Sequence, residues 1–318
     1  KFMPAVRNKF WDGKIRLYSA MNGLLYAGLN DKVEEFARKR QYEIEYASDF
    51  SDEEFSLKEA NEFIETLNVP SKYERRDYQI KAFAHAIRKK RALLLSPTAS
   101  GKSFIIYLIT RYYDAHTLII VPTTSLVSQL ASDFNDYGYN DDKFVHRIYA
   151  GQDKQTDKPI TISTWQSLYK MPKEYFEQFD VVIGDEAHLF KAKSLTSIMS
   201  KLTGCKYRFG FTGTLDGTVT NTMVINGLFG PIYQVTTTST LIEEKHLANF
   251  KIKCIILNYS DETKKIVKSY SYQDELSYII SSRKRNVFIK NLVLSLKGNS
   301  LILFQFVEAH GQKLYELI

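Results

Sequence analysis

From about residue 72 onward, short apolar runs alternate with segments whose apolar residues recur every three or four positions. The apolar runs are residues 92–96, 117–122, 160–164, 180–186 and 207–213. The helical spacing is clearest in residues 77–90, 102–113 and 125–138. Runs such as TLIIV and DVVIG are apolar on both faces, which is typical of a central parallel strand covered by helices on both sides. The alternation predicts an α/β fold built on a parallel sheet.

The first 70 residues have a different pattern. Two short apolar/polar alternations have turn signals at Asp12-Gly13 and Asn22-Gly23, which predicts strands joined by tight turns. Helical spacing follows over residues 30–43 and 56–68, and Val69-Pro70-Ser71 then interrupts it. We therefore expect a small α+β domain over residues 1–70.

Near the end of the sequence, residues 285–297 have the spacing of a helix. Residues 300–306 and 308–318 are then predicted to form one strand and one helix of a new unit. These elements are too few to complete a second sheet. We accordingly expect a first α/β domain over residues 71–255, and a linker with the beginning of a further domain over 256–318.

Composition adds little about function by itself. A length of 318 residues exceeds one ordinary core and agrees with two or more domains. The net charge of +7 suits a polyanionic partner, although any single cluster of Lys and Arg is more simply interpreted as a solvated helix face. No apolar run of about 18 residues or secretory signal is found, so we expect a cytoplasmic protein that does not enter a membrane. The two cysteines, Cys205 and Cys254, lack the spacing of a zinc site.

The segment SPTASGKS, residues 96–103, joins an apolar run to a helical segment. Backbone amides of such a loop can point at phosphate oxygens, the helix N-terminus attracts negative charge, and a lysine neutralises the phosphates. Ser96 stands where the strict G-x-x-x-x-G-K-[ST] pattern has its first glycine. The residues expected to hold the phosphates are Thr98, Ala99, Ser100, Gly101, Lys102 and Ser103.

A second signal follows about eighty residues later, where an apolar run ends at Asp185 and Glu186. A carboxylate at that strand end can hold Mg²⁺ together with Ser103, and its neighbour can orient or deprotonate an attacking water. We therefore expect Asp185 and Ser103 to bind Mg²⁺, and Lys102, Asp185 and Glu186 to carry catalysis.

The motifs SPTASGKS and DEAH together resemble the motor core of superfamily 2 helicases and translocases, and the resemblance extends from about residue 72 to the last residue. It implies a RecA-like parallel sheet of the P-loop NTPase class, preceded by the small α+β domain, with ATP and Mg²⁺ as cofactors. RRDYQ, residues 75–79, is similar to the family's glutamine motif, which implies that Gln79 contacts adenine and that Arg76 lies against the base.

The resemblance also implies how the ATP site is coupled to nucleic acid. FTGT, residues 211–214, stands where the family has the motif that links the two, which implies coupling roles for His188, Thr212 and Thr214. IIVPTTSL, STWQSL and the YAG segment resemble strand-contacting motifs. The contacts expected there are Pro122, Thr123, Thr124, Gly151 and Thr164. Hydroxyls and amides at a helix start can bind phosphate without reading a base, but the same residue types are also ordinary helix caps.

The leading segments WDGKIRL and NGLLYAGL are similar to the small first domain of the phage UvsW helicases, which act on branched DNA. This similarity implies a DNA partner. Arg7, Lys14 and Arg16 would form a face that contacts the duplex, while Trp11 fills the core of the domain.

The function expected is an ATP-dependent DNA helicase or translocase that remodels forks, junctions or R-loops. Family motifs V and VI are not found, and an arginine finger of the kind that motif VI supplies contributes on the order of 10³–10⁵ in rate, so we expect poor hydrolysis by this segment. Three alternatives stay open. They are an RNA helicase with the same core, the motor part of a restriction enzyme, and an ATP-switched nucleic-acid-binding module that does not unwind. The oligomeric state is not indicated.

Overall fold

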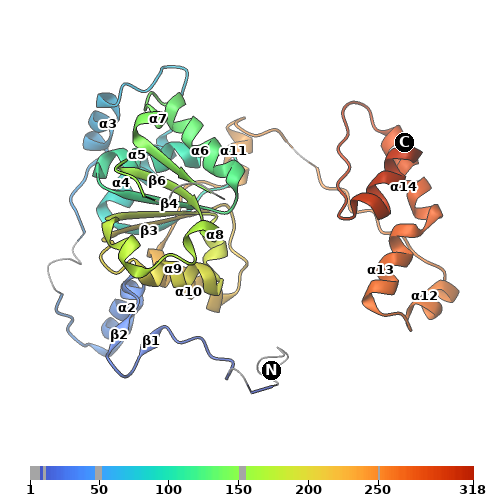
Figure 1. Ribbon diagram of the computed structural model, residues 1–318, viewed down its shortest axis with the longest axis horizontal. Helices are drawn as coiled ribbons and strands as arrows, with labels where there is room; N and C mark the ends of the chain where they lie inside the picture. Colours follow the sequence, from blue (N-terminus) through green and yellow to red (C-terminus); the bar gives the residue numbers. More distant parts are fainter. Residues whose placement is uncertain (1–7, 10–11, 47–51, 150–154, 250) are drawn as a thin grey trace. The chain divides into compact units, whose positions relative to one another are not determined.

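A seven-stranded parallel sheet forms the centre of the first part of the chain (Figure 1). The computed structural model describes residues 8–9, 12–46, 52–149, 155–249 and 251–318. In order across the sheet, the strands are β5 (Val145–Ile148), β6 (Ile160–Thr164), β4 (Thr117–Val121), β7 (Val181–Asp185), β8 (Tyr207–Thr212), β3 (Arg91–Leu95) and β9 (Ile232–Gln234). Every neighbouring pair is parallel. The predicted α/β fold is confirmed.

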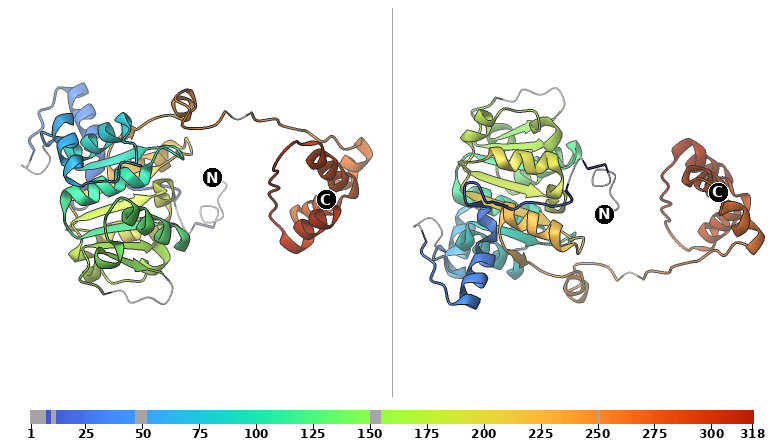
Figure 2. Two further views of the ribbon diagram at one scale, coloured as in Figure 1. Left: turned by 90° about the horizontal axis from the view of Figure 1, so that it is seen from above. Right: turned by 90° about the horizontal axis from the view of Figure 1, so that it is seen from below.

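Helices cover both faces of this sheet (Figures 1 and 2). One face packs against α3 (Leu57–Thr66), α4 (Asp77–Lys89), α5 (Lys102–Tyr113) and α6 (Thr124–Asp136). The other packs against α8 (Trp165–Leu168), α9 (Lys193–Lys201) and α10 (Val219–Phe229). Because successive side chains of a strand point to opposite faces, Leu118 and Ile120 join the second core while Ile119 and Val121 join the first. The double burial explains the uninterrupted apolar runs.

Shorter elements connect these layers. They are α7 (Asp141–Phe144), η3 (Lys173–Gln178), η4 (Ala187–Lys191) and α11 (Thr238–Glu243). In the part of the chain that the structure describes, no helix is long and apolar enough to cross a membrane.

Two glycines allow an aromatic ring to lie directly against the sheet beside the end of β7. Gly184 of β7 pairs with Gly210 of β8. A Cβ atom at Gly184 would come within 2.7 Å of the rings of Phe190 and Phe229, and one at Gly210 within 2.9 Å of Phe229. The two phenylalanine rings meet edge to face, with centroids 5.0 Å apart. This packing supports the strand one residue before Asp185.

The leading segment docks onto α10. It contains the antiparallel pair β1 (Tyr18–Ser19) and β2 (Leu24–Leu25), then η1 (Ala27–Leu29) and α2 (Asn30–Arg40). Gly28 approaches the end of α10 so closely that a Cβ atom would lie 2.0 Å from the carbonyl oxygen of Asn226. The hairpin predicted at Asn22-Gly23 is confirmed. The described residues near Asp12-Gly13 form no strand.

Contacts divide the chain into two units, residues 1–249 and 250–318. Within the first unit, Phe55, Ala60 and Ile64 of the segment around α3 share one hydrophobic core with the sheet. The Ser56 hydroxyl accepts a hydrogen bond from the Glu59 amide, and the Glu59 carboxylate accepts one from the Ser56 amide, which fixes the start of α3. The domain boundaries near residues 70 and 255 stay predictions.

The second unit is helical over the residues that the structure describes. Its helices are α12 (Asp261–Val267), α13 (Tyr272–Ser281), α14 (Arg283–Ser295), η5 (Val307–Gly311) and α15 (Gln312–Leu317). The helix predicted over residues 285–297 is confirmed by α14. The strand predicted over residues 300–306 is wrong, because a strand needs a neighbour for its backbone hydrogen bonds and described residues 251–318 contain none.

Gly184→Ala should destabilise the first unit, because the added methyl group meets two buried rings that cannot both move aside. We expect the free energy of unfolding to fall by about 1–3 kcal/mol, as for other overpacked cores. Urea denaturation measures this change. The control is Gly204→Ala, since a Cβ atom there meets no atom within 4 Å. Equal stability of the two variants would contradict the packing described.

Candidate active site

The register of three strands brings the predicted motifs to one edge of the sheet. Leu95, the last residue of β3, lies opposite Thr212 of β8, and Asp185 of β7 lies opposite Phe211 of the same strand. Because the strands are parallel, their carboxyl ends open onto the same side. The loop of residues 96–101, the Asp185-Glu186 pair and the segment leaving β8 therefore become neighbours.

The loop between β3 and α5 is tightly turned before the helix begins. Ala99 and Gly101 have φ angles of +65° and +77°, in the left-handed region that turns the chain sharply before α5. The Ser100 hydroxyl donates to the Pro97 carbonyl oxygen at 2.6 Å and lies 2.6 Å from the Ser96 hydroxyl. Ser96 and Ser100 are both buried. Through its contact with the Ser100 hydroxyl, Ser96 thus stabilises the loop at the position where the strict motif has glycine.

Lys102 is the first residue of α5 and pairs with both acidic residues. Its ammonium group donates to Glu186 Oε1 at 3.2 Å and lies 4.0 Å from Asp185 Oδ1. The Lys102 and Asp185 side chains are only 19% and 14% exposed, so their charges interact more strongly than a surface pair would. Glu186 has a φ angle of +49°, an uncommon conformation for a residue with a side chain and one found at functional sites.

The chemistry of Asp185 and Ser103 fits a magnesium ion. Burial raises the pKa of the Asp185 carboxyl, although nearby Lys102 acts in the opposite direction. A cation beside this carboxylate would offset the cost of burying its charge. Mg²⁺ prefers oxygen ligands, and it commonly uses one or two carboxylates together with substrate phosphates. No group of three or more His, Cys, Asp or Glu that could hold a metal occurs among the described residues, so such a site would depend on the phosphates.

Two residues that the sequence analysis did not identify lie against Ser103. The Tyr137 hydroxyl is 2.9 Å from Ser103 Oγ, and at Asp133 burial raises the pKa of the carboxyl while the Ser103 hydroxyl acts to lower it. Burial raises the pKa of Tyr137 to about 12, so its phenol keeps its proton and can donate. Ser103 can then accept this hydrogen bond and present the remaining lone pair of its oxygen to a metal. Asp133 lies in the last turn of α6, and Tyr137 directly follows the helix. The helical spacing of the sequence from residue 125 predicts the helix but not which of its side chains reach Ser103.

Gln79 and Arg76 hold the outer side of the loop. Gln79 Nε2 donates to the Ser100 carbonyl oxygen at 2.9 Å, and Gln79 Oε1 accepts a hydrogen bond from the Arg76 amide at 3.1 Å. The Arg76 guanidinium donates to the Ala99 carbonyl oxygen at 3.1 Å. A Cβ atom at Gly101 would lie 2.2 Å from Gln79 Nε2, so glycine is required for this contact. The adenine contact stays a prediction.

His188 joins Glu186 to the segment that follows β8. His188 Nδ1 lies 2.9 Å from Thr212 Oγ1 and 3.4 Å from Glu186 Oε2. The Thr212 hydroxyl donates its one proton to the Thr214 carbonyl oxygen at 2.9 Å, so the hydrogen-bond network assigns the donor role to His188 Nδ1. The three residues predicted to couple the site to nucleic acid are therefore in contact, while the coupling itself stays a prediction.

The residues expected to contact nucleic acid follow two neighbouring strands. Val121 of β4 pairs with Thr164 of β6, so Pro122, Thr123 and Thr124 come close to Thr164 at the carboxyl ends. Thr123 is the N-cap of α6 and accepts a hydrogen bond from the Leu126 amide. Thr164 Oγ1 lies 3.1 Å from the Ser167 hydroxyl. Capping does not exclude the predicted phosphate contacts, which depend on the free amides of the same helix starts.

Two of the remaining predicted contacts are described residues of the leading segment. Lys14 and Arg16 precede β1 and are exposed, and the Arg16 guanidinium pairs with the Asp12 carboxylate. Arg7, Trp11 and Gly151 lie outside the described residues.

Comparison with known proteins gives consistent matches. A family model described as the res subunit of type III restriction enzymes matches residues 72–217. The ATP-dependent DNA helicase uvsW of Enterobacteria phage T4 is 36% identical over an alignment of 333 residues, gaps included. The alignment covers 100% of this chain and 66% of that protein. The crystal structure of the UvsW helicase from bacteriophage T4 has a TM-score of 0.66 at 36% identity, over 73% of this chain and 86% of that one.

A more distant relative matches part of the chain. The DNA 3'-5' translocase XPB2 of Sulfurisphaera tokodaii is 30% identical over 197 residues, which cover 62% of this chain and 43% of that protein. The chain thus spans 66% and 43% of the lengths of these two curated relatives.

Tyr137→Phe should weaken magnesium-dependent nucleotide binding. The substitution keeps the ring that packs edge to face against Tyr73 and Phe104 but removes the hydroxyl that orients Ser103. Loss of such a supporting hydrogen bond typically costs 10–100-fold in metal affinity, so we expect the Mg²⁺ concentration for half-maximal binding to rise about tenfold. Titration of Mg²⁺ against a fluorescent ATP analogue measures it. Tyr139→Phe is the matched control, and an identical shift in both variants would refute the assignment.

Proposed function

Because this chain belongs to the superfamily 2 helicases and translocases, we propose that it uses ATP hydrolysis to remodel branched DNA such as forks, junctions and R-loops. The observation that carries the proposal is the continuous series of polar contacts from Lys102 through Glu186 and His188 to Thr212. This series connects the phosphate loop to the segment that leaves the sheet after β8. A motor needs such a connection, because the state of the nucleotide must be transmitted to the elements that hold the strand.

Each residue at the strand ends would have its own role in ATP binding and hydrolysis. Lys102, at the N-terminus of α5, would bind the β- and γ-phosphates of ATP. Its ammonium group would then exchange Glu186 for phosphate oxygens, which leaves the Glu186 carboxylate available to orient the attacking water. Mg²⁺ held by Ser103 and Asp185 would neutralise charge on the phosphates. Gln79, which contacts the loop backbone, would also contact the adenine base.

Coupling would follow from the same exchange. When Glu186 loses the Lys102 contact, its interaction with His188 Nδ1 at 3.4 Å changes, and His188 is the donor to Thr212. The segment after Thr212 leads to Thr214, whose carbonyl oxygen accepts from the Thr212 hydroxyl. A shift of His188 would therefore move the backbone at residues 212–214. The path is physical and short, with each step a single hydrogen bond or ion pair.

The DNA would be bound at the carboxyl ends of β4 and β6. The starts of α6 and α8, beside Thr123 and Thr164, would bind backbone phosphates and leave the bases unread, which suits a protein that moves along a strand. Lys14 and Arg16 of the leading segment would contact duplex DNA. The T4 relative is described as a DNA helicase, which supports DNA as the partner.

ATP hydrolysis by this protein is expected to be slow, but it should respond to the nucleic acid that is added. The rates are compared at one fixed salt concentration, because phosphate contacts make binding strongly salt-dependent. We expect the strongest stimulation by four-way junctions or forks, compared with duplex, single-stranded DNA and single-stranded RNA. Lys102→Ala should lower turnover on the order of 10²–10³-fold, as for the loss of one electrostatic donor in an active site. Lys58→Ala, on the exposed face of α3, is the control.

Each other outcome selects a different function. Stimulation by RNA that equals or exceeds that by DNA would replace DNA as the partner and leave the motor assignment in place. Hydrolysis that accompanies strand release without any strand displacement would indicate an ATP-switched binding module. Full turnover in Lys102→Ala would overturn the catalytic assignment.

A further inference from the structure

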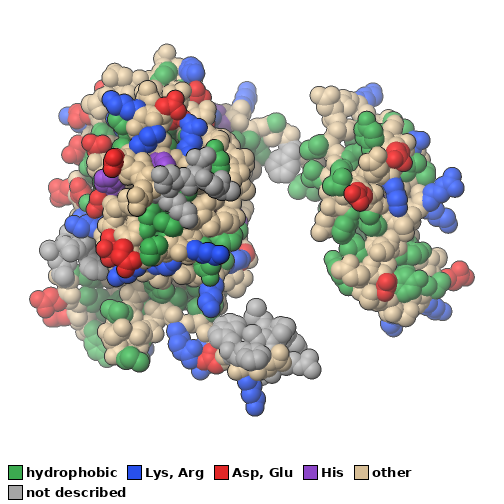
Figure 3. Space-filling view, viewed as in Figure 1, with side chains coloured by type: hydrophobic (Ala, Val, Ile, Leu, Met, Phe, Trp, Pro, Cys, Tyr) green, Lys and Arg blue, Asp and Glu red, His purple; other side chains and the backbone are tan. Residues whose placement is uncertain are grey.

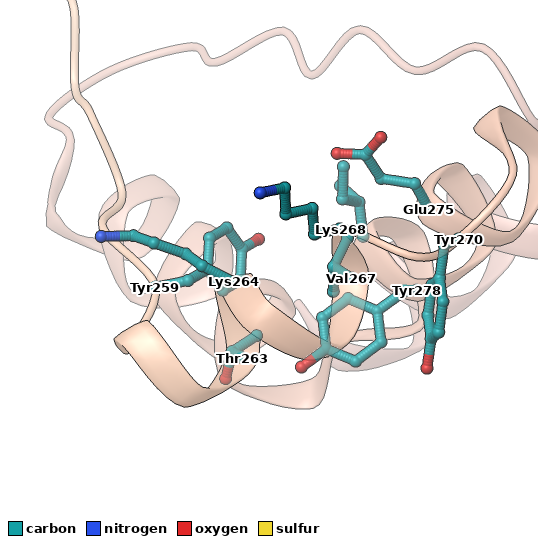
Figure 4. Close-up of a pocket in the computed structure, with 9 residues that line it drawn as sticks. Tyr259, Thr263, Lys264, Val267, Lys268, Tyr270, Glu275 and Tyr278 are labelled. Atoms are coloured by element: carbon teal, nitrogen blue, oxygen red, sulfur yellow. The ribbon is translucent and has the colours of Figure 1, made fainter.

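A cavity of about 280 Å³ lies in the second unit, between α12, α13 and the chain segments beside them (Figure 4). It is lined by three tyrosines, two lysines, one glutamate and smaller side chains. These residues are Tyr259, Thr263, Lys264, Val267, Lys268, Tyr270, Glu275, Tyr278 and Ile279. No residue of the candidate active site takes part.

The three tyrosine rings are arranged around the cavity without stacking on one another. The Tyr278 ring centroid lies 6.5 Å from that of Tyr259 at 56°, and 6.3 Å from that of Tyr270 at 74°. Neither pair is stacked face to face, and an edge-to-face contact covers only one face of one ring, which leaves the opposite face for a flat ligand. Tyr270 and Tyr278 are 40% and 36% exposed. These rings come from the turn after α12 and from α13, and Figure 4 shows them side by side at the same edge of the cavity.

The lysines give the same cavity a positive edge. Lys264 and Lys268 are four residues apart at the end of α12 and therefore lie on one side of the helix. Lys264 pairs with Asp261 at 3.1 Å, but the side chains are 59% and 89% exposed, so this pair is weak and exchangeable. Among the residues that the structure describes, Lys268 has no carboxylate within 4.0 Å. Figure 3 shows Lys and Arg side chains beside apolar ones on the visible face of this unit.

We propose that this cavity binds one nucleotide of a single-stranded nucleic acid, with the base against Tyr270 and Tyr278 and the phosphate at Lys264 and Lys268. Aromatic rings that stack bases, combined with lysines that follow the backbone, are how proteins bind single strands without reading sequence. The volume is near the lower end of the roughly 300–1,000 Å³ of ligand pockets, which suits one nucleotide. The contact goes beyond the proposed function, since it lies outside the motor motifs and needs no hydrolysis.

Binding of a short fluorescent oligothymidylate, measured by anisotropy without ATP at several salt concentrations, tests this assignment. Tyr270→Ala should weaken binding about tenfold, within the range for loss of one base stack, with the salt slope unchanged. Lys268→Ala should weaken binding and reduce the salt slope by about 0.7, as expected when one phosphate contact on a single strand is lost. Tyr270→Phe keeps the ring and should restore affinity, which separates lost stacking from lost folding.

Matched controls stand beside the cavity. Tyr272, 74% exposed, and Lys265 do not line it, so Tyr272→Ala and Lys265→Ala should bind as the unaltered protein does. Photocrosslinking of an oligonucleotide that carries 5-iododeoxyuridine should place the crosslink at Tyr270 or Tyr278. Affinities of the cavity variants equal to those of the controls would overturn the proposal.

A second source of the same ligand chemistry is a free nucleotide. Thymidine monophosphate is added as a competitor. If it leaves the oligonucleotide bound, the result supports a strand site. If it displaces the oligonucleotide with an affinity similar to that of the oligonucleotide itself, the cavity is a mononucleotide site instead. Because these measurements contain no ATP, a failure of nucleic-acid-stimulated hydrolysis would contradict the proposed function without affecting this result.

Discussion

The parallel register of β3, β7 and β8 is the constraint on which the site depends. Leu95 opposite Thr212 and Asp185 opposite Phe211 make three chain segments leave the sheet at one edge, although about 120 residues separate the first from the last. A shift of one residue in any of these strands would turn every side chain to the opposite face. Gly184 and Gly210 support the register, because Phe229 packs where side chains would otherwise stand.

The chemistry at this edge comes from charges that are brought together in a largely buried place. Lys102 faces Asp185 and Glu186, and each carboxylate is stabilised there by the ammonium group. A phosphate that bound Lys102 in the proposed way would change the surroundings of Glu186, whose Oε2 lies 3.4 Å from His188 Nδ1. The left-handed backbone at Glu186 places its side chain between these two partners.

Two helix starts lie along the same edge. Thr123 caps α6, as the ordinary interpretation of such residues predicts, and its position next to Thr164 also assembles two helix N-termini on adjacent strands. In the second unit, a different combination of tyrosines and lysines offers ring faces and ammonium groups without helix starts. The two regions would hold a strand through different forces, so they are distinguishable by their dependence on salt.

The sequence by itself determined the features that are encoded locally. The five central strands, the helices α3 to α6 on one face of the sheet, the loop of residues 96–103 and the Asp185-Glu186 pair follow from apolar period and from loop residues close together in the chain. The helices α8, α9 and α10 on the other face were not predicted. Only the tertiary structure decided features that depend on partners distant in sequence. It added the edge strands β5 and β9, placed Tyr137 against Ser103, and left residues 300–306 without a strand to pair with. Strand pairing and buried hydrogen bonds require two segments, and the pattern within one segment does not identify the other.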